Sequence, residues 1–408
     1  MALGPIVQAV RGATIVAPRR TRWGDALRVH DGLFARWDQS ECNNGGVVLN
    51  RDGMFVLPGF IDLHVHFDEP GRTDWEGVEK GSLKSVLGGV TTVVDMPIDS
   101  DPPTIAARDV TEKCEIFLAK SFSNFAVLAG AVPGRLAEMR EAALAGAAGF
   151  KGFLCDSGWD DFPRLDGESL QEALVNASRI GLRLALHAED QSQFVSDQIG
   201  DLGRPVSSEV SAVSTILTLA GEFGAKVHLV HLSTPEAVRM VNNSPLATSE
   251  TCPHYFSSDE VLVRFGLDGV VVSPPVRSAS LRNELRELVQ NGWLDAVGSD
   301  HSPGPPNSDS FSGQWRGAQG AGKTMLALLD EFDSPELVAD YTASAASVYG
   351  FATSGEISVG GQADFVVAER SDNGLWRIVD VVVGGRLVVN DSTVIGRPVV
   401  RNAISRTF

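Results

Sequence analysis

The sequence is poor in cysteine and histidine, and it has no long apolar run. It contains 4 cysteines and 8 histidines among 408 residues. The cysteines are scattered and include no CxxC pair, which argues against a disulfide framework and favours a reducing compartment. They are Cys42, Cys114, Cys155 and Cys252. No uninterrupted apolar run approaches the roughly 20 residues that a membrane-spanning helix needs. The opening residues MALGPIVQAVRGATIVAPRR carry no basic leader before their apolar residues and are typical of a strand, so we expect a cytoplasmic protein.

Positive charge is also scarce. Lys and Arg number 34 against 52 Asp and Glu, which gives a net charge of −18. This charge repels nucleic-acid phosphates and anionic membrane surfaces, so we expect neither as a partner. The content of 43% hydrophobic and 21% charged residues is that of an ordinary soluble globular protein. The chain is long enough for one large domain and a smaller one.

Both ends of the chain have the pattern of small antiparallel sheets. Residues 1–57 and 355–408 contain short alternating runs rich in β-branched residues, separated by Gly and by Asp or Asn clusters. We predict that these two ends together form a small β-sandwich domain. Residues 58–354 would then form a separate body between them.

The central segment alternates short apolar runs with helical stretches such as residues 167–180 and 281–293. The apolar runs number eight and cover residues 60–67, 90–97, 125–132, 149–154, 182–189, 226–233, 247–255 and 295–303. Eight βα units over roughly 250 residues match the size of a TIM (β/α)8 barrel, and near-continuous apolar strands fit a sheet covered by helices. An open doubly wound sheet is the alternative architecture.

Polar residues gather where the predicted strands end, which is where the active site of a TIM barrel lies. They are His64, His66, Lys151, His187, His231, His254, Asp300 and His301. His64 and His66 stand at positions i and i+2 of a strand, so their side chains face the same side. Together with the other histidines and an acidic strand end, this pair predicts a metal site, whereas a pair of satisfied core histidines is the alternative. Imidazole and carboxylate ligands suit Zn, Mn, Fe, Co or Ni.

Other polar residues of the barrel segment allow more than one interpretation. Lys151 lies in the apolar run GFKGFL, and a buried lysine must be neutral or paired unless its amine reaches solvent. Asp300 is a candidate for metal binding and proton transfer, or else for capping a turn in SDHSPGPP. His254 is a candidate to orient a ligand or a water. His228 lies three residues before His231, so we expect it to face the opposite way and to be structural.

Seven motifs, in order, resemble the cyclic-amide branch of the amidohydrolase superfamily, which includes dihydroorotase, hydantoinase/dihydropyrimidinase and allantoinase. The motifs are PGFIDLHVHFDEPG, GFKGF, LHAED, VHLVHLSTPEAV, ETCPHY, SPPVR and GSDHSP. The resemblance covers about residues 50–365 and implies a metal-dependent hydrolase of cyclic amides. A non-catalytic scaffold that lost its metals is an alternative of another class, but here every metal-ligand position of the pattern is filled.

The resemblance assigns roles to the matching positions. It implies two sets of ligands for two divalent ions, Zn or else Mn, Co, Fe or Ni: His64, His66 and Asp300 for one ion, and His187 and His231 for the other. Lys151 is implied to carry a carboxylate on its amine and to bridge the two ions. A hydroxide held between the ions would be the nucleophile, and Asp300 would serve as general base and then as general acid.

Within the branch, the stretches EPGRTDWEG, GRPVSSEVSAV and SDHSPGPP look most like allantoinase, which implies hydrolysis of allantoin to allantoate. A hydantoinase, dihydropyrimidinase or dihydroorotase-like activity is the alternative. Dihydroorotases usually have a basic residue two positions after the histidine pair, and this sequence has Asp68 there, which would repel a carboxylate and could accept from ureido N–H groups. The sequence departs from allantoinases at Gly304, where they usually have Cys, and at WRGAQG, which matches their WGGIAG only loosely.

Further residues are expected near the substrate on the same resemblance. Ser273 and Pro274 lie in VVVSPPVR, where the family holds the amide edge of the ring with backbone groups, and Cys155 is expected to line the pocket. His254 and His301 are expected behind the metal ligands. The expected partner is a small cyclic ureide, and the resemblance implies a homo-oligomer, either a tetramer or a dimer.

Overall fold

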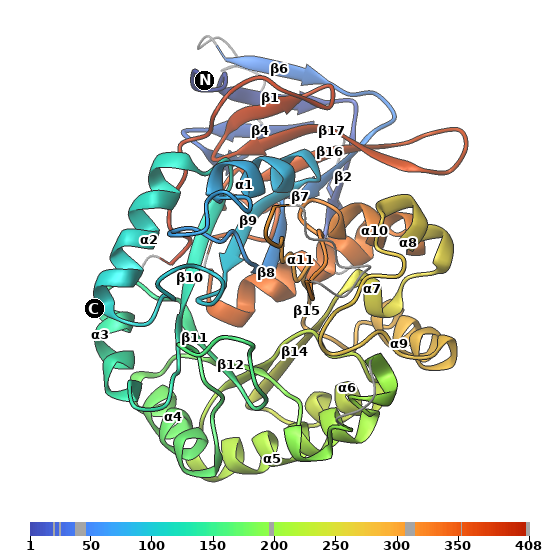
Figure 1. Cartoon of the computed structure of the whole chain (residues 1–408). Coiled ribbons are helices and arrows are strands. Elements are labelled where there is room, and N and C mark those ends of the chain that lie inside the picture. Colours follow the sequence, from blue (N-terminus) through green and yellow to red (C-terminus); the bar gives the residue numbers. More distant parts are fainter. Residues whose placement is uncertain are drawn as a thin grey trace.

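The core of the protein is a closed ring of eight parallel strands with helices around it (Figure 1). This computed structural model describes residues 1–18, 21–23, 26–36, 46–195, 200–306, 315–351 and 353–404. The ring strands are β8 (Phe60–Val65), β9 (Val90–Asp95), β10 (Asn124–Gly130), β11 (Gly149–Phe153), β12 (Leu184–His187), β13 (Val227–Leu229), β14 (Ala247–Thr251) and β15 (Ala296–Val297). Each pairs with the next, and the ring closes where the His66 N–H donates to the His301 carbonyl over 2.8 Å. The predicted TIM barrel is confirmed, and an open doubly wound sheet is excluded.

Helices connect the strands and cover the outside of the barrel. They are α1 (Val78–Leu87), α2 (Ala107–Lys120), α3 (Met139–Leu144), α4 (Gly167–Ile180), α5 (Val206–Phe223), α6 (Pro235–Asn242), α7 (Pro253–Phe256), α8 (Asp259–Phe265), α9 (Ala279–Gln290), α10 (Thr324–Phe332) and α11 (Pro335–Tyr349). The helix predicted over residues 167–180 coincides with α4, and the one predicted over 281–293 is α9.

Helix α4 shows how the sequence sets these elements. The Asp166 side chain caps its first turn by accepting from the Ser169 amide over 3.0 Å, and Gly181 ends it with a φ of 80°. Its buried residues recur at helical spacing and join the apolar layer between helices and barrel: Leu170, Ala173, Leu174 and Ala177.

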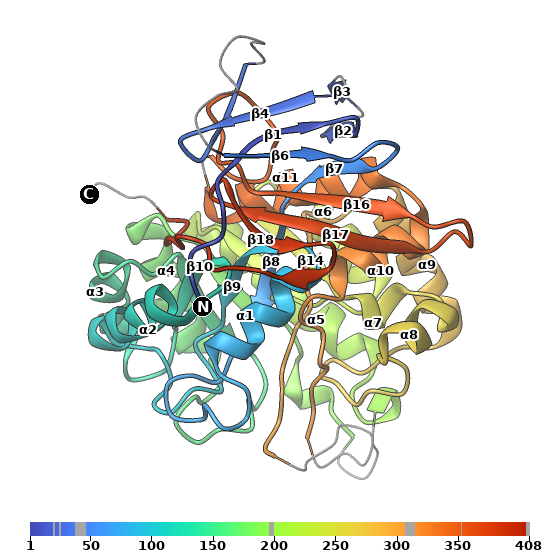
Figure 2. The same ribbon diagram turned by 90° about the horizontal axis from the view of Figure 1, so that it is seen from above.

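Two small sheets lie against one side of the barrel, stacked on each other (Figure 2). One has the order β5 (Leu33–Ala35), β4 (Ala26–His30), β1 (Val7–Arg11) and β6 (Val47–Asn50). The other has the order β19 (Thr393–Val394), β18 (Arg386–Asn390), β17 (Trp376–Val383), β16 (Phe365–Arg370), β7 (Phe55–Pro58), β2 (Thr14–Ala17) and β3 (Thr21–Trp23).

The two small sheets form the predicted β-sandwich from both ends of the chain. Strand β7 pairs with β16 in antiparallel register, with Pro58 opposite Phe365, so early and late segments share one sheet. The sheets bury a common apolar core that includes Val7 and Leu27 from one and Val56 from the other. The exact domain boundaries at residues 57 and 355 stay a prediction.

Much of the barrel interior below the site is apolar. Ile61, Leu63 and Leu128 belong to one buried cluster there, together with Ala345 and Tyr349 of α11, which packs against β8 and β15. The polar residues therefore concentrate at the opposite, C-terminal ends of the strands, as the fold requires of an active site.

The described part of the chain offers no helix with the length and apolarity needed to cross a membrane. Cys114, Cys155 and Cys252 are free thiols, and Cys42 lies outside the described residues.

A buried ion pair joins α2 to the end of β9. Lys113 of α2 and Asp95 are each 1% exposed, and the Lys113 Nζ lies 2.5 Å from the Asp95 carboxylate. The Lys113 amine also donates to the Met96 carbonyl over 3.0 Å, while Asp95 accepts from the Phe67 amide over 3.1 Å. Because neither charge reaches water, each depends on the other.

We expect Lys113→Met to lower the free energy of unfolding by about 3–5 kcal/mol, because it leaves the Asp95 carboxylate buried without its counter-ion. Urea denaturation measures this change. Lys80→Met, at an exposed position of α1, is the matched control and should stay within about 0.5 kcal/mol of the wild type. Similar small effects of both substitutions would contradict a dependent buried pair.

Candidate functional site

A cleft of about 550 Å³ opens among the loops at the C-terminal ends of the barrel strands. All the residues predicted as metal ligands line it: His64, His66, Lys151, His187, His231 and Asp300. The structure thus brings together side chains that come from five different strands or the loops that follow them. Their roles in metal binding stay a prediction.

The first predicted ligand set converges on one point. The Asp300 Oδ1 lies 3.2 Å from the His64 Nε2 and 3.6 Å from the His66 Nε2. Burial raises the pKa of Asp300, but the imidazoles of His64, His66 and His231 outweigh it and hold this pKa well below its usual value. An ionised carboxylate beside two imidazoles is a donor set that suits a divalent transition metal.

The remaining imidazole nitrogens of this pair are held by buried carboxylates. The His64 Nδ1 lies 2.5 Å from Glu250, and the His66 Nδ1 lies 2.8 Å from Asp99. Each Nδ1 lies beside a carboxylate, and each Nε2 faces Asp300. Pairing with a carboxylate in this way fixes the tautomer and the orientation of a metal-binding histidine.

Lys151 projects from β11 into the same cluster. Its side chain is fully buried, and its amine has no hydrogen-bond partner among the described residues. The amine lies 4.9 Å from the centre of the Phe153 ring. Burial lowers the pKa of Lys151 to about 8 from a usual 10.5, which increases the share of neutral amine. A buried polar atom usually has a hydrogen-bond partner. The Lys151 amine has none and forms no ion pair among the described residues, which indicates a further ligand or a modification of this amine.

The second predicted ligand set adjoins the first. The rings of His187 and His231 lie 4.5 Å apart, and the His231 ring lies 5.3 Å from that of His64. The His231 Nδ1 has no partner in the described part of the chain. Burial, with help from the neighbouring His187 and Lys151, holds the pKa of His231 well below its usual value, so its imidazole is neutral and able to bind a cation.

Arg204 lies next to His187. Its guanidinium donates to Glu189, over 3.0 Å from Nε, and to the Ser273 Oγ over 2.9 Å, and it lies 3.4 Å from the Cys155 Sγ. Glu189 in turn lies 2.7 Å from the His187 Nε2. Cys155, His187 and Glu189 could by distance hold an ion, but the guanidinium already supplies the positive charge there. We therefore assign no ion to that group.

Of the predicted substrate contacts, Ser273 lines the cleft and the other three do not. Cys155 is buried next to Arg204, and the Pro274 carbonyl accepts from a buried tyrosine hydroxyl over 2.6 Å. The Asp68 side chain is 1% exposed, its carboxylate has no partner among the described residues, and burial raises its pKa to about 9. The structure therefore does not support a direct contact between Asp68 and a substrate, because this side chain is enclosed by protein.

The two histidines expected behind the ligands lie in different places. His254 is fully buried, and its imidazole lies within 4.8 Å of the carboxylate of Asp300. The His301 side chain pairs instead with Glu76, and its ring contacts that of Phe67. His301 therefore supports the site through its backbone, which closes the barrel, and its imidazole lies outside the cleft lining.

The prediction that His228 faces the opposite way from His231 is wrong, whereas its structural role stays a prediction, since His228 lies outside the cleft lining. The His228 Nε2 lies 3.3 Å from Glu250, the carboxylate that also holds His64. The alternation argument fails because β13 ends at Leu229 and His231 adopts a φ of 42°, so strand geometry does not extend between the two histidines.

Sequence reasoning missed the carboxylates that hold the imidazoles, and it also missed two arginines that line the cleft, Arg204 and Arg316. Glu189 follows His187 by two residues, and Glu250 is an acid inside a buried strand, so both carried a signal. Asp99 follows the second strand by a short loop and gave a weaker one. Arg204 comes from a loop between a strand and a helix, and nothing in the local sequence indicates that it turns into the cleft.

Tryptophans form one wall of the cleft mouth. Trp159 and Trp315 line the cleft, and Trp75 packs edge-on against Trp315 with ring centres 5.0 Å apart. The Trp159 Nε1 donates to Asp99 over 2.7 Å, so this wall is attached to the carboxylate that orients His66.

Comparisons with known proteins agree with this geometry. The model of the amidohydrolase family matches residues 55–388. An allantoinase from Rubrobacter xylanophilus is 36% identical over 404 residues, covering 91% of this chain and 87% of its own. An allantoinase from Bacillus velezensis is 35% identical over 384 residues, covering 88% and 84%. Among solved structures, an L-hydantoinase (dihydropyrimidinase) from Arthrobacter aurescens superposes with a TM-score of 0.87 at 24% identity, covering 97% of this chain and 99% of its own.

We expect Asp99→Asn to weaken the binding of one divalent ion by about 10–100-fold, because the carboxylate that orients the His66 imidazole is lost. Competition with a chromophoric chelator measures this affinity. Asp156→Asn is the matched control, since Asp156 also lines the cleft but, among the described residues, its carboxylate accepts only from the Gly158 amide over 3.0 Å. Equal affinities of the two variants would contradict the role of Asp99.

Proposed function

The chain belongs to the amidohydrolase family, and on this premise we propose that it is a cyclic amidohydrolase that opens the ring of a cyclic ureide, converting allantoin and water to allantoate. The observation that carries the proposal is the convergence of four histidines, Lys151 and Asp300 in one cleft at the C-terminal end of the barrel. The allantoinases that match the chain along most of its length support the choice of substrate.

The residues present fit two divalent ions. His64, His66 and Asp300 would hold one ion, and His187 and His231 would hold the other. The unpartnered, buried amine of Lys151 supports a carboxylate on its Nζ as the bridge between the ions. Zinc is the ion we propose, and Mn, Co, Fe or Ni accept the same donors. Bound there, two cations would polarise the amide carbonyl and lower the pKa of a water molecule.

Asp300 is the residue that moves the proton. Its carboxylate lines the cleft and is ionised in the free protein, so it can accept a proton from water as the new C–O bond forms. The same group then returns this proton to the ring nitrogen as the C–N bond breaks. Water is thereby added across the amide bond, and the product carries a carboxyl group and an open-chain N–H.

The cleft also carries a guanidinium that is free to meet the substrate. Arg316 lines the cleft, its one polar contact in the described structure is with the Ser273 Oγ over 3.4 Å, and it has no ion-pair partner among the described residues. This residue lies in WRGAQG, where the chain departs from the allantoinase pattern. A carbonyl oxygen on the substituent of the ring, such as that of a ureido group, is the natural acceptor for it.

Alternative rings belong in the test of this function. The hydantoinase structure, at under 25% identity, supports the fold. It does not decide which ring is the substrate. Because Asp68 lies outside the cleft lining while Arg316 lies in it, Asp68 gives no reason to exclude a substrate with a carboxylate, and dihydroorotate has to be included. A homo-oligomeric state, dimer or tetramer, and a cytoplasmic location remain part of the proposal.

The direct experiment measures ring opening of allantoin, hydantoin, dihydrouracil and dihydroorotate by protein purified with zinc and bicarbonate. We expect the highest kcat/KM for allantoin. A higher value for another ring would keep the amidohydrolase and change the substrate. Failure on all four rings by protein with two bound ions would overturn the proposed reaction.

Arg316→Met should lower kcat/KM for allantoin by about 10-fold and leave kcat/KM for hydantoin unchanged. Hydantoin lacks the ureido substituent whose carbonyl a charged donor would bind. Steady-state kinetics on both substrates give this ratio. Arg164→Met, at an exposed position away from the cleft lining, controls for the loss of one positive charge. An equal fall on both substrates would contradict substituent recognition by Arg316.

A further inference from the structure

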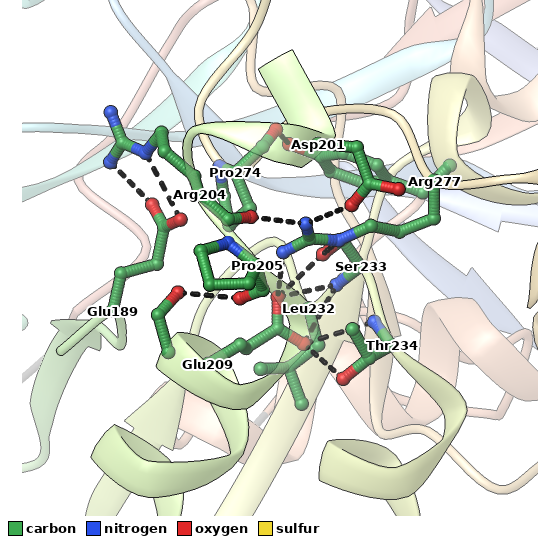
Figure 3. Close-up of polar contacts among 12 residues, drawn as sticks. Glu189, Asp201, Arg204, Pro205, Glu209, Leu232, Ser233, Thr234, Pro274 and Arg277 are labelled. Carbon is green, nitrogen blue, oxygen red and sulfur yellow. Dashed lines mark hydrogen bonds and ion pairs between the residues drawn. The ribbon is translucent and has the colours of Figure 1, made fainter. Parts of the chain in front are cut away.

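A buried arginine, Arg277, lies at the centre of a polar network beside the cleft (Figure 3). Its side chain is fully buried. The guanidinium donates from Nη1 to the Arg204 carbonyl over 2.5 Å and to Asp201 over 2.6 Å, and from Nε to the Ser233 Oγ over 3.0 Å. One side chain thus holds the loop that carries Arg204 and the segment that follows β13.

Glu209 of α5 is the anionic counterpart in this network. Its carboxylate is fully buried and accepts from the hydroxyl of Ser233 over 2.5 Å and from that of Thr234 over 2.6 Å. It also accepts from both of their backbone amides, over 3.2 Å and 2.9 Å, and it lies 4.0 Å from the Arg277 Nη2. Figure 3 shows these bonds converging from the residues that follow Leu232.

One arm of the network leads to His231. Ser233 is the second residue after His231, which adopts a φ of 42°, a conformation that a non-glycine residue keeps only when its surroundings hold it. The four hydrogen bonds to Glu209 fix the chain directly after this residue. They therefore constrain the backbone from which the His231 imidazole projects.

The other arm leads to His187. Arg277 fixes the backbone of Arg204 at its carbonyl, and the Arg204 guanidinium binds Glu189, which lies 2.7 Å from the His187 Nε2. Both histidines of the second ligand set are thus connected to the same buried pair, Arg277 and Glu209.

The first ligand set has a separate support. His64 is held by Glu250 and His66 by Asp99, and among the described residues neither carboxylate contacts Arg277 or Glu209. The two halves of the centre therefore depend on different buried charges.

We propose that Arg277 and Glu209 are positioning residues that set the geometry of His187 and His231, and so control the affinity of one of the two ions without affecting the other. This inference rests on the proposed two-ion centre. It assigns to the Arg277–Glu209 pair a function in metal binding although neither residue touches the cleft.

The test is a zinc titration of the metal-free full-length chain against a chromophoric chelator, with the unfolding midpoint measured in parallel. Wild type should bind two ions. Arg277→Met should bind one ion with wild-type affinity and the other at least about 10-fold more weakly, as expected when support behind a ligand is lost. Arg277→Lys should recover part of the lost affinity, because it keeps the charge and fewer of the hydrogen bonds.

Two further variants make the outcome decisive. Arg286→Met on α9 removes a structural arginine that binds the Phe256 carbonyl and Glu331, and it should keep both ions at wild-type affinity. Ser233→Ala removes the hydroxyl that lies between Arg277 and Glu209. This variant replaces Arg277→Met in the titration if Arg277→Met does not fold. It should weaken the same single ion.

The failures of the two proposals are distinguishable. A wild type that binds fewer than two ions would overturn the two-ion centre and this inference together. A wild type with two ions, beside Arg277→Met or Ser233→Ala variants that either keep both affinities or lose both equally, would overturn the inference alone.

Discussion

A lysine amine buried without a hydrogen-bond partner is the constraint on which the rest of the site depends. Lys151 lies on barrel strand β11, and its side chain is fully buried. Burial makes a charged amine costly and lowers the pKa of Lys151. A folded protein keeps such a group only where something else satisfies it. The imidazoles and the carboxylate of Asp300 that share its cleft are the donors that would surround two cations, and a carboxylated Lys151 would complete them.

Buried carboxylates also contact the imidazoles of the site and orient them. Glu250, Asp99 and Glu189 each contact one histidine of the cleft, and Glu189 is itself neutralised by Arg204. A buried carboxylate needs a counter-charge or several donors, so each acid draws further residues into order. The polar shell around the cleft is consequently extended and reaches residues as distant from the cleft as Arg277.

The sequence was sufficient for the barrel and for the shared direction of His64 and His66, because both follow from local periodicity, whereas the full set of predicted metal ligands rests on the family resemblance. Eight apolar runs with intervening helices predicted the eight strands, and His64 and His66 at i and i+2 predicted a shared direction. Residues whose direction is set by tertiary contacts could not be predicted in this way. His228 shares Glu250 with His64 although strand alternation had turned it away, and Asp68 is enclosed although its position suggested the cleft mouth. Arg204 enters from a loop whose path only the packed structure determines.

The proposed two-ion centre depends on the role of Lys151 in metal binding. The most direct measurement is the metal content of wild type and Lys151→Ala after loading with zinc and ¹³C-bicarbonate, combined with ¹³C NMR of the protein. The account predicts two ions per chain and a carbamate signal in the wild type, and loss of that signal together with at least one ion in the variant. A Lys151→Ala protein that still holds two ions would contradict it.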